Sequence, residues 1–225
     1  MTTLASSVDV PPVVETGVPA TAPKQADPGP LGLAAIAGSA FILSVFNAGL
    51  VSRTAFPVLL GVALAYGGVV LVLAGMWEYR VGNTFAGLAF SSYGAFFLSF
   101  WAFEHFYLHE IVTAPGGPAQ LGRAIGLFVL PWAVFSTYMF VASLRTTAAL
   151  ATVFGLAVPT LWLLTLGYFG LHVDHKQVTN ELIKAAGWFG ILTAVAAWYA
   201  SFAGVTNATF GRVVLPVKSL KKPAA

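Results

Sequence analysis

Long uncharged apolar runs alternate with short polar segments along most of the chain. The runs extend over Leu31 to Ser52, Thr54 to Trp77, Val81 to Phe103, Ala124 to Leu144, Thr146 to Leu171 and Ala185 to Gly211. Each run reaches the roughly 20 residues that an α-helix needs to cross a bilayer, and none alternates as a membrane β-strand does. The pattern predicts an all-α membrane protein in which six transmembrane helices form one bundle with a central pathway.

Turn and cap residues predict where these helices begin and end. The first helix is expected to open at the prolines of 27–33 and to end near Asn47 or Leu50. The others are expected at about 57–77, 84–108, 122–144, 147–169 and 181–202. Asn83 or Thr84 is a competent cap for the third helix, and Pro159 should kink the fifth. Residues 207–216 are expected to form a short membrane-proximal ending.

Composition supports a chain dissolved in lipid. Of its 225 residues, 58% are hydrophobic and 8% are charged, whereas about a quarter of a soluble protein is charged. We expect a disordered N-terminal tail at 1–26, a six-helix transmembrane domain at 27–216 and a basic tail at 217–225. The first segment has no cationic start and no apolar core, so a cleaved signal peptide is not expected. The predicted location is the plasma or inner membrane, crossed several times.

The Lys and Arg residues predict the orientation. With six spans, the side that holds both termini carries Lys24, Arg80, Arg145, Arg212, Lys218, Lys221 and Lys222. The other side carries Arg53, Arg123, Lys176 and Lys184 together with Glu104, Glu110, Asp174 and Glu181. Both termini are therefore expected to be cytoplasmic. The net charge of +3 follows from this bias and the basic tail, so no nucleic-acid partner is expected.

A polar segment between two apolar runs, Ala74 to Gly94, is the richest in candidate chemistry. Glu78 and Arg80 are expected to be boundary charges between two spans. The candidate pathway residues are Asn47, Tyr66, Ser91, Ser92 and Tyr93, because polar groups inside a membrane bundle are costly and often functional. No charged residue is expected mid-span, so the solute should cross as a neutral species or as an anion held by dipoles.

Enzyme and metal chemistry find little support. His105 and His109 lie four residues apart, a spacing that could bind a metal, but they fall at a helix end, and a third ligand would have to be His172 or His175. The chain has no cysteine and no nucleophile or phosphate-loop motif. We expect no enzyme activity, no cofactor and no metal.

Three motifs resemble a known family. They are D-P-G-P-L-G-L at 27–33, G-N-T-F-A-G-L-A-F-S-S-Y-G at 82–94 and F-G-R-V-V-L-P at 210–216. Their order and sequence resemble the acetate uptake transporter family, which includes bacterial succinate-acetate permeases and yeast acetate and ammonia export proteins. The residues that carry the signature are Asp27, Pro28, Pro30, Leu31, Gly32, Gly82, Asn83 and Thr84.

The resemblance implies a homo-hexamer with one pathway per protomer, which moves acetate and related carboxylates such as succinate, with protons or as a channel. It also implies an apolar constriction made by Tyr93, a first-helix position that falls on Ile36, and a fifth-helix position near Leu156 or Ala157. Asp27 replaces the asparagine of the family signature. We hypothesise that Asp27 caps the first helix or is partly protonated, and that Asp27→Asn keeps or raises acetate uptake.

Two other functions fit the sequence. One is a pore for small neutral solutes such as ammonia, urea or amides, and the other is a carboxylate sensor that does not transport. For acetate, whose pKa is roughly 4 to 5 like that of side-chain carboxyls, an apolar constriction is costly to the anion. A proton, or hydrogen bonds from Tyr93, Asn47, Ser91 and Ser92, would offset that cost, so uptake should be stronger in acid.

Overall fold

The computed structural model describes residues 25–170 and 176–220. Its α-helices are α1 (Gly29–Asn47), α2 (Pro57–Val62), α3 (Leu71–Arg80), α4 (Thr84–Ala102), α5 (Leu108–Thr113), α6 (Gly117–Ser143), α7 (Ala148–Gly170) and α8 (Lys176–Phe210). A 3-10 turn at Arg53–Ala55 precedes α2, and π-helical segments join α2 to α3 (Ala63–Val70) and α4 to α5 (Phe103–Tyr107).

Helical segments that follow one another without a break are here called a rod. Six rods in the described ranges are long and apolar enough to cross a membrane. Within the two described ranges they are Gly29–Asn47, Arg53–Arg80, Thr84–Thr113, Gly117–Ser143, Ala148–Gly170 and Asn180–Phe210. The predicted all-α fold with six spans is confirmed. The two π-helical segments were not predicted, because apolar periodicity does not distinguish a wider turn from an α-turn.

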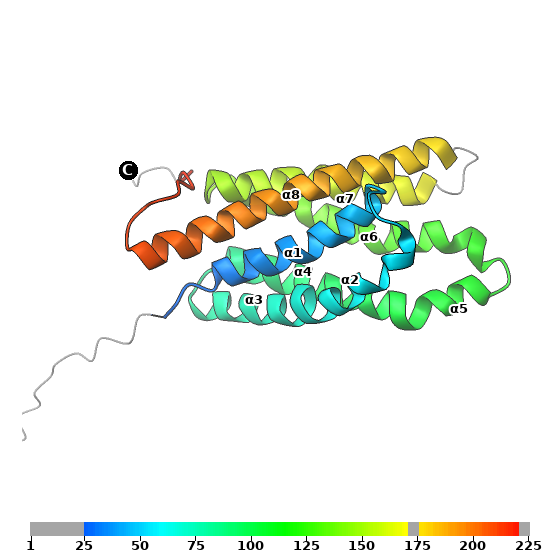
Figure 1. The fold of residues 1–225 in the computed structure, drawn as a ribbon, viewed down its shortest axis with the longest axis horizontal. Coiled ribbons are helices and arrows are strands. Elements are labelled where there is room, and N and C mark those ends of the chain that lie inside the picture. The colour runs from blue at the N-terminus through cyan, green and yellow to red at the C-terminus, as the bar shows by residue number, and fades with distance from the viewer. Residues whose placement is uncertain (1–24, 171–175, 221–225) are drawn as a thin grey trace, which may run out of the picture.

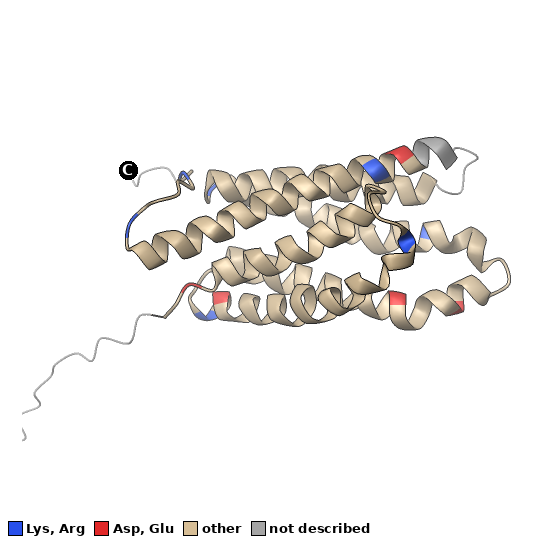
Figure 2. Cartoon of the chain, viewed as in Figure 1, with Lys and Arg blue, Asp and Glu red and all other residues tan. Residues whose placement is uncertain are grey.

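The rods lie side by side, with α8 between α1 and α7, α6 against α7, and α3 against α4 (Figure 1). The start of α1 and the end of α8 lie at the same end of the bundle. We call this the termini end; it also holds the end of α3 and the starts of α4 and α7. The opposite end is the loop end. The charged residues gather at these two ends, and the middle of the bundle is uncharged (Figure 2).

Several predicted helix ends were wrong. The third rod continues to Thr113 instead of 108, and the fourth begins at Gly117 instead of 122, since Gly116 has a φ of +74° and Pro118 suits a first turn. The last helix spans Lys176–Phe210, well beyond 181–202. It includes the first part, 207–210, of the segment expected to form a short ending, and it stops where Gly211 takes a φ of +63°. The predicted ends differ from the observed ones because these helices continue beyond the apolar runs from which they were predicted.

Glycines allow the closest helix contacts. A Cβ atom on Gly75 of α3 would lie 2.6 Å from the backbone nitrogen of Ser91 on α4. A Cβ on Gly187 of α8 would lie 2.7 Å from the Cα of Ala48, just past the end of α1. Because backbone atoms cannot move aside as a flexible side chain can, these two contacts require glycine.

The segment after α8 folds back onto the bundle. We call residues 213–220 the C-terminal strap. The backbone N–H of Ala148 donates to the Lys218 carbonyl at 2.8 Å, and that of Leu220 donates to Thr146 at 2.9 Å. The Asn207 side-chain oxygen accepts from the N–H groups of the strap residues at 214 and 215, at 2.7 and 2.9 Å. The strap therefore begins inside the expected domain and continues into the expected basic tail. The rest of both expected tails, residues 1–24 and 221–225, lies outside the described residues.

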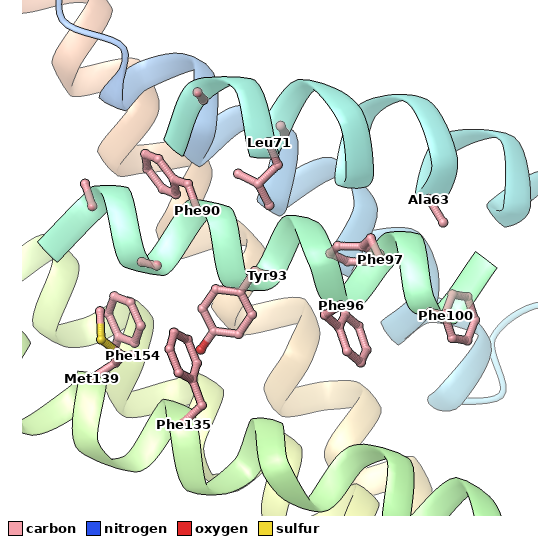
Figure 3. Close-up of a cluster of buried hydrophobic side chains, with 14 of the residues drawn as sticks. Ala63, Leu71, Phe90, Tyr93, Phe96, Phe97, Phe100, Phe135, Met139 and Phe154 are labelled. Atoms are coloured by element: carbon pink, nitrogen blue, oxygen red, sulfur yellow. The ribbon is translucent and has the colours of Figure 1, made fainter. Parts of the chain in front are cut away.

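An aromatic row on α4 forms much of the core (Figure 3). Its members are Phe90, Tyr93, Phe96, Phe97 and Phe100, all at most 8% exposed. Figure 3 shows Tyr93 on the side of α4 that faces side chains from α6 and α7, namely Phe135, Met139 and Phe154. Phe90 and Phe97 lie on the other side of α4, against Gly32 of α1 and Gly67 of the second rod. This row sets the position of the functional site described next.

Candidate functional site

A cavity of about 320 Å³, here called cavity 1, lies among α1, α4, α7 and α8. At the termini end its lining includes Asp27, Glu78, Asn83, Thr147, Asn207 and the strap residue Val217. Asp27 and Asn83 are exposed, so the cavity reaches the protein surface there. Deeper in the bundle the lining becomes almost entirely apolar and ends at Leu43, Asn47 and Leu164.

A second cavity, of about 570 Å³ and here called cavity 2, lies at the loop end. Its lining includes Arg53 and Phe56 near the start of the second rod. Glu104 of the third rod and Pro118 at the start of α6 line it as well. It therefore approaches the middle of the bundle from the side opposite to cavity 1.

Four residues line both cavities: Leu43, Asn47, Phe96 and Leu164. We call them the barrier, because they occupy the place where the two cavities meet. Phe96 is held there by ring contacts to Trp132 and Phe128, with centroids 5.4 and 5.6 Å away. A solute that passes between the cavities must pass these four side chains.

Asn47 is the polar member of the barrier. It ends α1, is 6% exposed, and its Oδ1 has no hydrogen-bond partner among the described residues. A side-chain amide carries two N–H donors and one acceptor oxygen. Since buried polar groups are normally paired, an amide oxygen left unpaired between two cavities is available to a solute. The pathway position predicted for Asn47 agrees with this geometry.

Tyr93 lines cavity 1 but its hydroxyl is already engaged. The hydroxyl lies 2.5 Å from the Ser136 hydroxyl of α6, and the ring packs edge-on against Phe135 at 5.2 Å between centroids (Figure 3). The ring therefore presents an apolar surface to the cavity. Ile36 and Ala157, the other expected constriction positions, line cavity 1 as well.

The other predicted pathway residues do not line either cavity in the part of the chain that the structure describes. They are Tyr66, Ser91, Ser92 and Leu156. Ser91 faces α3 beside Gly75, and Tyr66 packs near Gly38 of α1. One residue turns a helix by about 100°, so neighbours of Tyr93 on α4 point in other directions, which proximity in sequence does not reveal.

The signature residues mostly build helix ends near cavity 1. Asp27 Oδ1 accepts the Gly29 N–H at 2.9 Å, as the capping hypothesis expects. Pro28 precedes α1, and the carbonyl of Pro30 accepts the hydroxyl of Ser201 on α8 at 2.6 Å. Gly32 packs against the Phe90 ring.

The signature at the junction of α3 and α4 acts in the same way. Gly82 takes a φ of +81°, and Asn83 Oδ1 accepts the Ala86 N–H at 3.3 Å, which confirms the predicted cap. Thr84 is the first residue of α4. Leu31 differs from the rest, since it is 49% exposed and does not line either cavity within the described residues.

Glu78 is the residue that sequence reasoning misjudged. It was expected to be a boundary charge, but its side chain is 1% exposed and lines cavity 1. Its Oε2 accepts from the Asn83 side-chain nitrogen at 2.8 Å, and its Oε1 has no partner among the described residues. Arg80 does behave as a boundary charge: it is exposed, with its guanidinium 5.4 Å from the Trp77 ring centre.

His105 and several threonines of the spans make local contacts. His105 stacks on Trp101 at 5.4 Å between centroids, and no group of three His, Cys, Asp or Glu side chains is assembled in the described ranges. His172 and His175, the suggested further ligands to His105 and His109, lie outside them. Threonines of the spans, including Thr137, Thr160, Thr165 and Thr193, donate to carbonyls of their own helices at 2.8 Å.

Similar proteins were found by sequence. "Acetate permease A" of Emericella nidulans is 39% identical over 198 residues, 86% of this chain and 66% of that protein. "Ammonia transport outward protein 2" of Saccharomyces cerevisiae is 35% identical over 189 residues, 84% of this chain and 64% of that protein. The chain thus spans a little under two thirds of the length of these fungal relatives. "Succinate-acetate/proton symporter SatP" of Escherichia coli is 31% identical over 194 residues, 86% of this chain and 96% of that protein.

A solved structure and a family model agree with these matches. The structure described as the bacterial acetate channel SatP has a TM-score of 0.73 at 32% identity, and covers 86% of this chain and 99% of that one. The chain is a multi-pass membrane protein, as predicted. The model of the GPR1/FUN34/yaaH family matches residues 13–222, which confirms the resemblance seen in the motifs. The chain belongs to the GPR1/FUN34/yaaH family.

Proposed function

We propose that this protein transports acetate and related short carboxylates, such as succinate, across the plasma or inner membrane through cavity 1, the barrier and cavity 2. One observation carries the proposal: two cavities from opposite ends of the bundle share four lining residues. Relatives named as an acetate permease, a succinate-acetate/proton symporter and an acetate channel identify the solute class.

The lining suggests how the solute moves. Ile36, Tyr93, Ala157 and Phe96 offer apolar surface, against which a bare carboxylate would lose its hydration at considerable cost. A proton taken up with the solute removes the charge altogether, and the unpaired Oδ1 of Asn47 at the narrow point is placed to accept the O–H of the protonated carboxyl. We assign Tyr66, Ser91, Ser92 and Leu156 to packing around this pathway.

The activity proposed is transport without covalent chemistry, so we propose no enzymatic role, no cofactor and no metal. We also propose a homo-hexamer with one pathway per protomer. Large apolar side chains on the outer surface, among them Trp188, which is 53% exposed, and Phe202, which is 59% exposed, would face lipid or a neighbouring protomer in this assembly. Mass photometry of the protein in nanodiscs would test the stoichiometry.

Radiolabelled acetate uptake tests the function directly. Purified protein in liposomes should take up acetate faster than protein-free liposomes, and unlabelled succinate and propionate should compete while urea does not. Uptake should rise as the external pH falls, because protonation removes the charge that must cross the apolar lining. Uptake no faster than in protein-free liposomes contradicts the proposal.

A second candidate is export or passage of ammonia, since one relative is named an ammonia transport outward protein. An uncharged solute would pass the apolar barrier without a proton. Competition by urea or amides but not by succinate would favour this reading. Saturable acetate binding without uptake would favour a sensor instead.

A further inference from the structure

A carboxyl group with a free oxygen lies in cavity 1 at the termini end. The Glu78 side chain is 1% exposed and lines the cavity. Asn83 donates to one of its oxygens at 2.8 Å, and the other oxygen, Oε1, has no partner within the described residues. Since a buried ionised carboxylate is costly unless it is paired, this oxygen calls for a partner that enters the cavity.

A second carboxylate lies beside it. A Cβ atom on Gly29 would be 3.0 Å from Asp27 Oδ1 and 3.2 Å from Glu78 Oε1, so both oxygens approach the same point next to α1. Asp27 holds its place by accepting the Gly29 N–H at 2.9 Å. The two acidic side chains therefore form a pair at the outer end of cavity 1.

No Lys or Arg of the described residues lines the cavity beside this pair. Asp27 and Glu78 are the charged residues among those that line cavity 1 in the described ranges. The groups that face them from the other elements are neutral: Asn83 before α4, Thr147 before α7, Asn207 on α8 and Val217 on the strap. Arg80 lies over Trp77 instead, and the described residues contain no ion pair to Glu78.

An anion that enters from the termini end therefore meets two like charges in an apolar cavity. Like charges close together disfavour ionisation of both groups. One proton bound to the pair weakens the repulsion of the anion. A protonated carboxyl can also donate a hydrogen bond to the anion, whereas an ionised carboxylate can only accept one.

We propose that Glu78 is the proton-binding residue of this pathway, an inference that rests on the proposed carboxylate transport. Glu78 takes a proton from solution at the termini end, and the Oε1–H donates to a carboxylate oxygen of the solute. The proton then moves to that oxygen: the Oε1–H bond breaks, a new O–H bond forms, and the solute continues as a neutral acid. The ionised Glu78 keeps the Asn83 hydrogen bond until it binds the next proton.

Proteoliposome uptake between pH 6 and 8, with the same pH on both sides of the membrane, tests this proposal in either orientation. The concentration of the acetate anion is nearly constant in this range, and subtraction of protein-free liposomes removes the neutral acid that crosses the bilayer unaided. Wild-type uptake should fall with rising pH, by up to about tenfold per pH unit once Glu78 ionises. Glu78→Gln, which can donate a hydrogen bond but cannot give up a proton, should lose most of the uptake seen at pH 6 and keep a low rate that does not titrate. Glu110→Gln, an exposed carboxyl on α5, is the matched control and should follow the wild type.

Two further variants make the test specific. Asp27→Asn should keep the fall in uptake but move it to lower pH, because one fewer negative charge lies near Glu78. Uptake near neutral pH should then drop, in contrast to the unchanged or higher uptake expected from the sequence alone. Glu78→Asp should keep a titrating profile, and it provides the test if Glu78→Gln fails to fold. A Glu78→Gln profile that falls as steeply as the wild type, or a flat Glu78→Asp profile, overturns the proposal. Wild-type acetate uptake without any pH dependence overturns it while the transport function stands, whereas no wild-type uptake overturns both.

Discussion

At the scale of single residues, two buried polar side chains define the cavities. Asn47 and Glu78 are 6% and 1% exposed, and each has an oxygen without a partner among the described residues. An unpaired buried polar atom typically costs about 1–3 kcal/mol. Both residues line a cavity, so the cost is explained if each one binds a solute or a proton during transport.

Asn47→Ala should lower acetate uptake about two- to tenfold, since a hydrogen bond to a neutral solute contributes about 0.5–1.5 kcal/mol. The variant should fold normally as far as Oδ1 is concerned, because this oxygen has no partner to lose within the described residues. Initial uptake rates in proteoliposomes measure the effect. Asn180→Ala, an exposed asparagine near the start of α8, serves as the control. Equal rates for the two variants would remove Asn47 from the pathway.

Leu164→Ala should widen the barrier, since Leu164 lines both cavities and is 6% exposed. Succinate uptake should rise several-fold relative to acetate, because the larger solute gains more from the space. The same change should cost about 2–5 kcal/mol of stability, which a thermal melt in detergent would detect. Leu166→Ala removes the same atoms from a side chain that is 54% exposed on the same helix. An unchanged ratio in Leu164→Ala would place the narrow point elsewhere.

Sequence reasoning identified some of the residues that line the cavities and missed others. Asn47 and Tyr93 were recognised because they are large polar groups in apolar runs, and Ile36 through the motif alignment. Glu78 was missed since its burial depends on Asn83 and on the start of α1, which pack against it only in the fold. Phe96 was missed for a related reason: in a row of buried aromatics, sequence does not tell which ring separates two cavities.

At the scale of elements, the number and order of the helices were predictable and their ends were not. A run of about 20 apolar residues indicates a span, but α8 continues to Phe210 and α6 begins at Gly117, where the chain has left the apolar run. The helix contacts depend on glycines whose partners lie far away in sequence, as with Gly187 of α8 and Ala48 after α1.

Gly187→Ala should separate α1 from α8, because the added Cβ would lie 2.7 Å from the Cα of Ala48. Overpacking of this kind typically costs about 1–3 kcal/mol, so the melting temperature in detergent should fall. Acetate uptake should fall with it, since Asn47 lies at the end of α1. Gly61→Ala on α2 is the control, as its Cβ would meet no atom within 4 Å. A melting temperature equal to that of the control would mean that the two helices tolerate the extra methyl group.

At the scale of the whole molecule, the charges mark the two ends of the bundle and the apolar middle lies between them (Figure 2). Six spans place the start of α1 and the end of α8 at one end. Which end faces the cytoplasm follows only from the Lys and Arg bias. The orientation also decides the direction of the proton step, since Glu78 lies at the termini end.

The orientation can be measured without first removing native thiols, since the chain has no cysteine. Single variants Ala114→Cys at the loop end and Ala208→Cys at the termini end both place a thiol at an exposed position. If the termini are cytoplasmic, a membrane-impermeant maleimide should label Ala114→Cys on intact cells. It should label Ala208→Cys only after permeabilisation. The reverse pattern would place Glu78 at the outer face.

The C-terminal strap has a practical consequence for reporter design. Val217 lines cavity 1 while its neighbours are hydrogen-bonded to the start of α7, so a fluorescent protein fused shortly after Leu220 would be tethered beside the opening. Such a fusion would crowd the route and weaken apparent transport even though the membrane domain is intact. A fusion protein of this kind would then be scored as inactive although its membrane domain is intact. A small epitope is the safer label at that end.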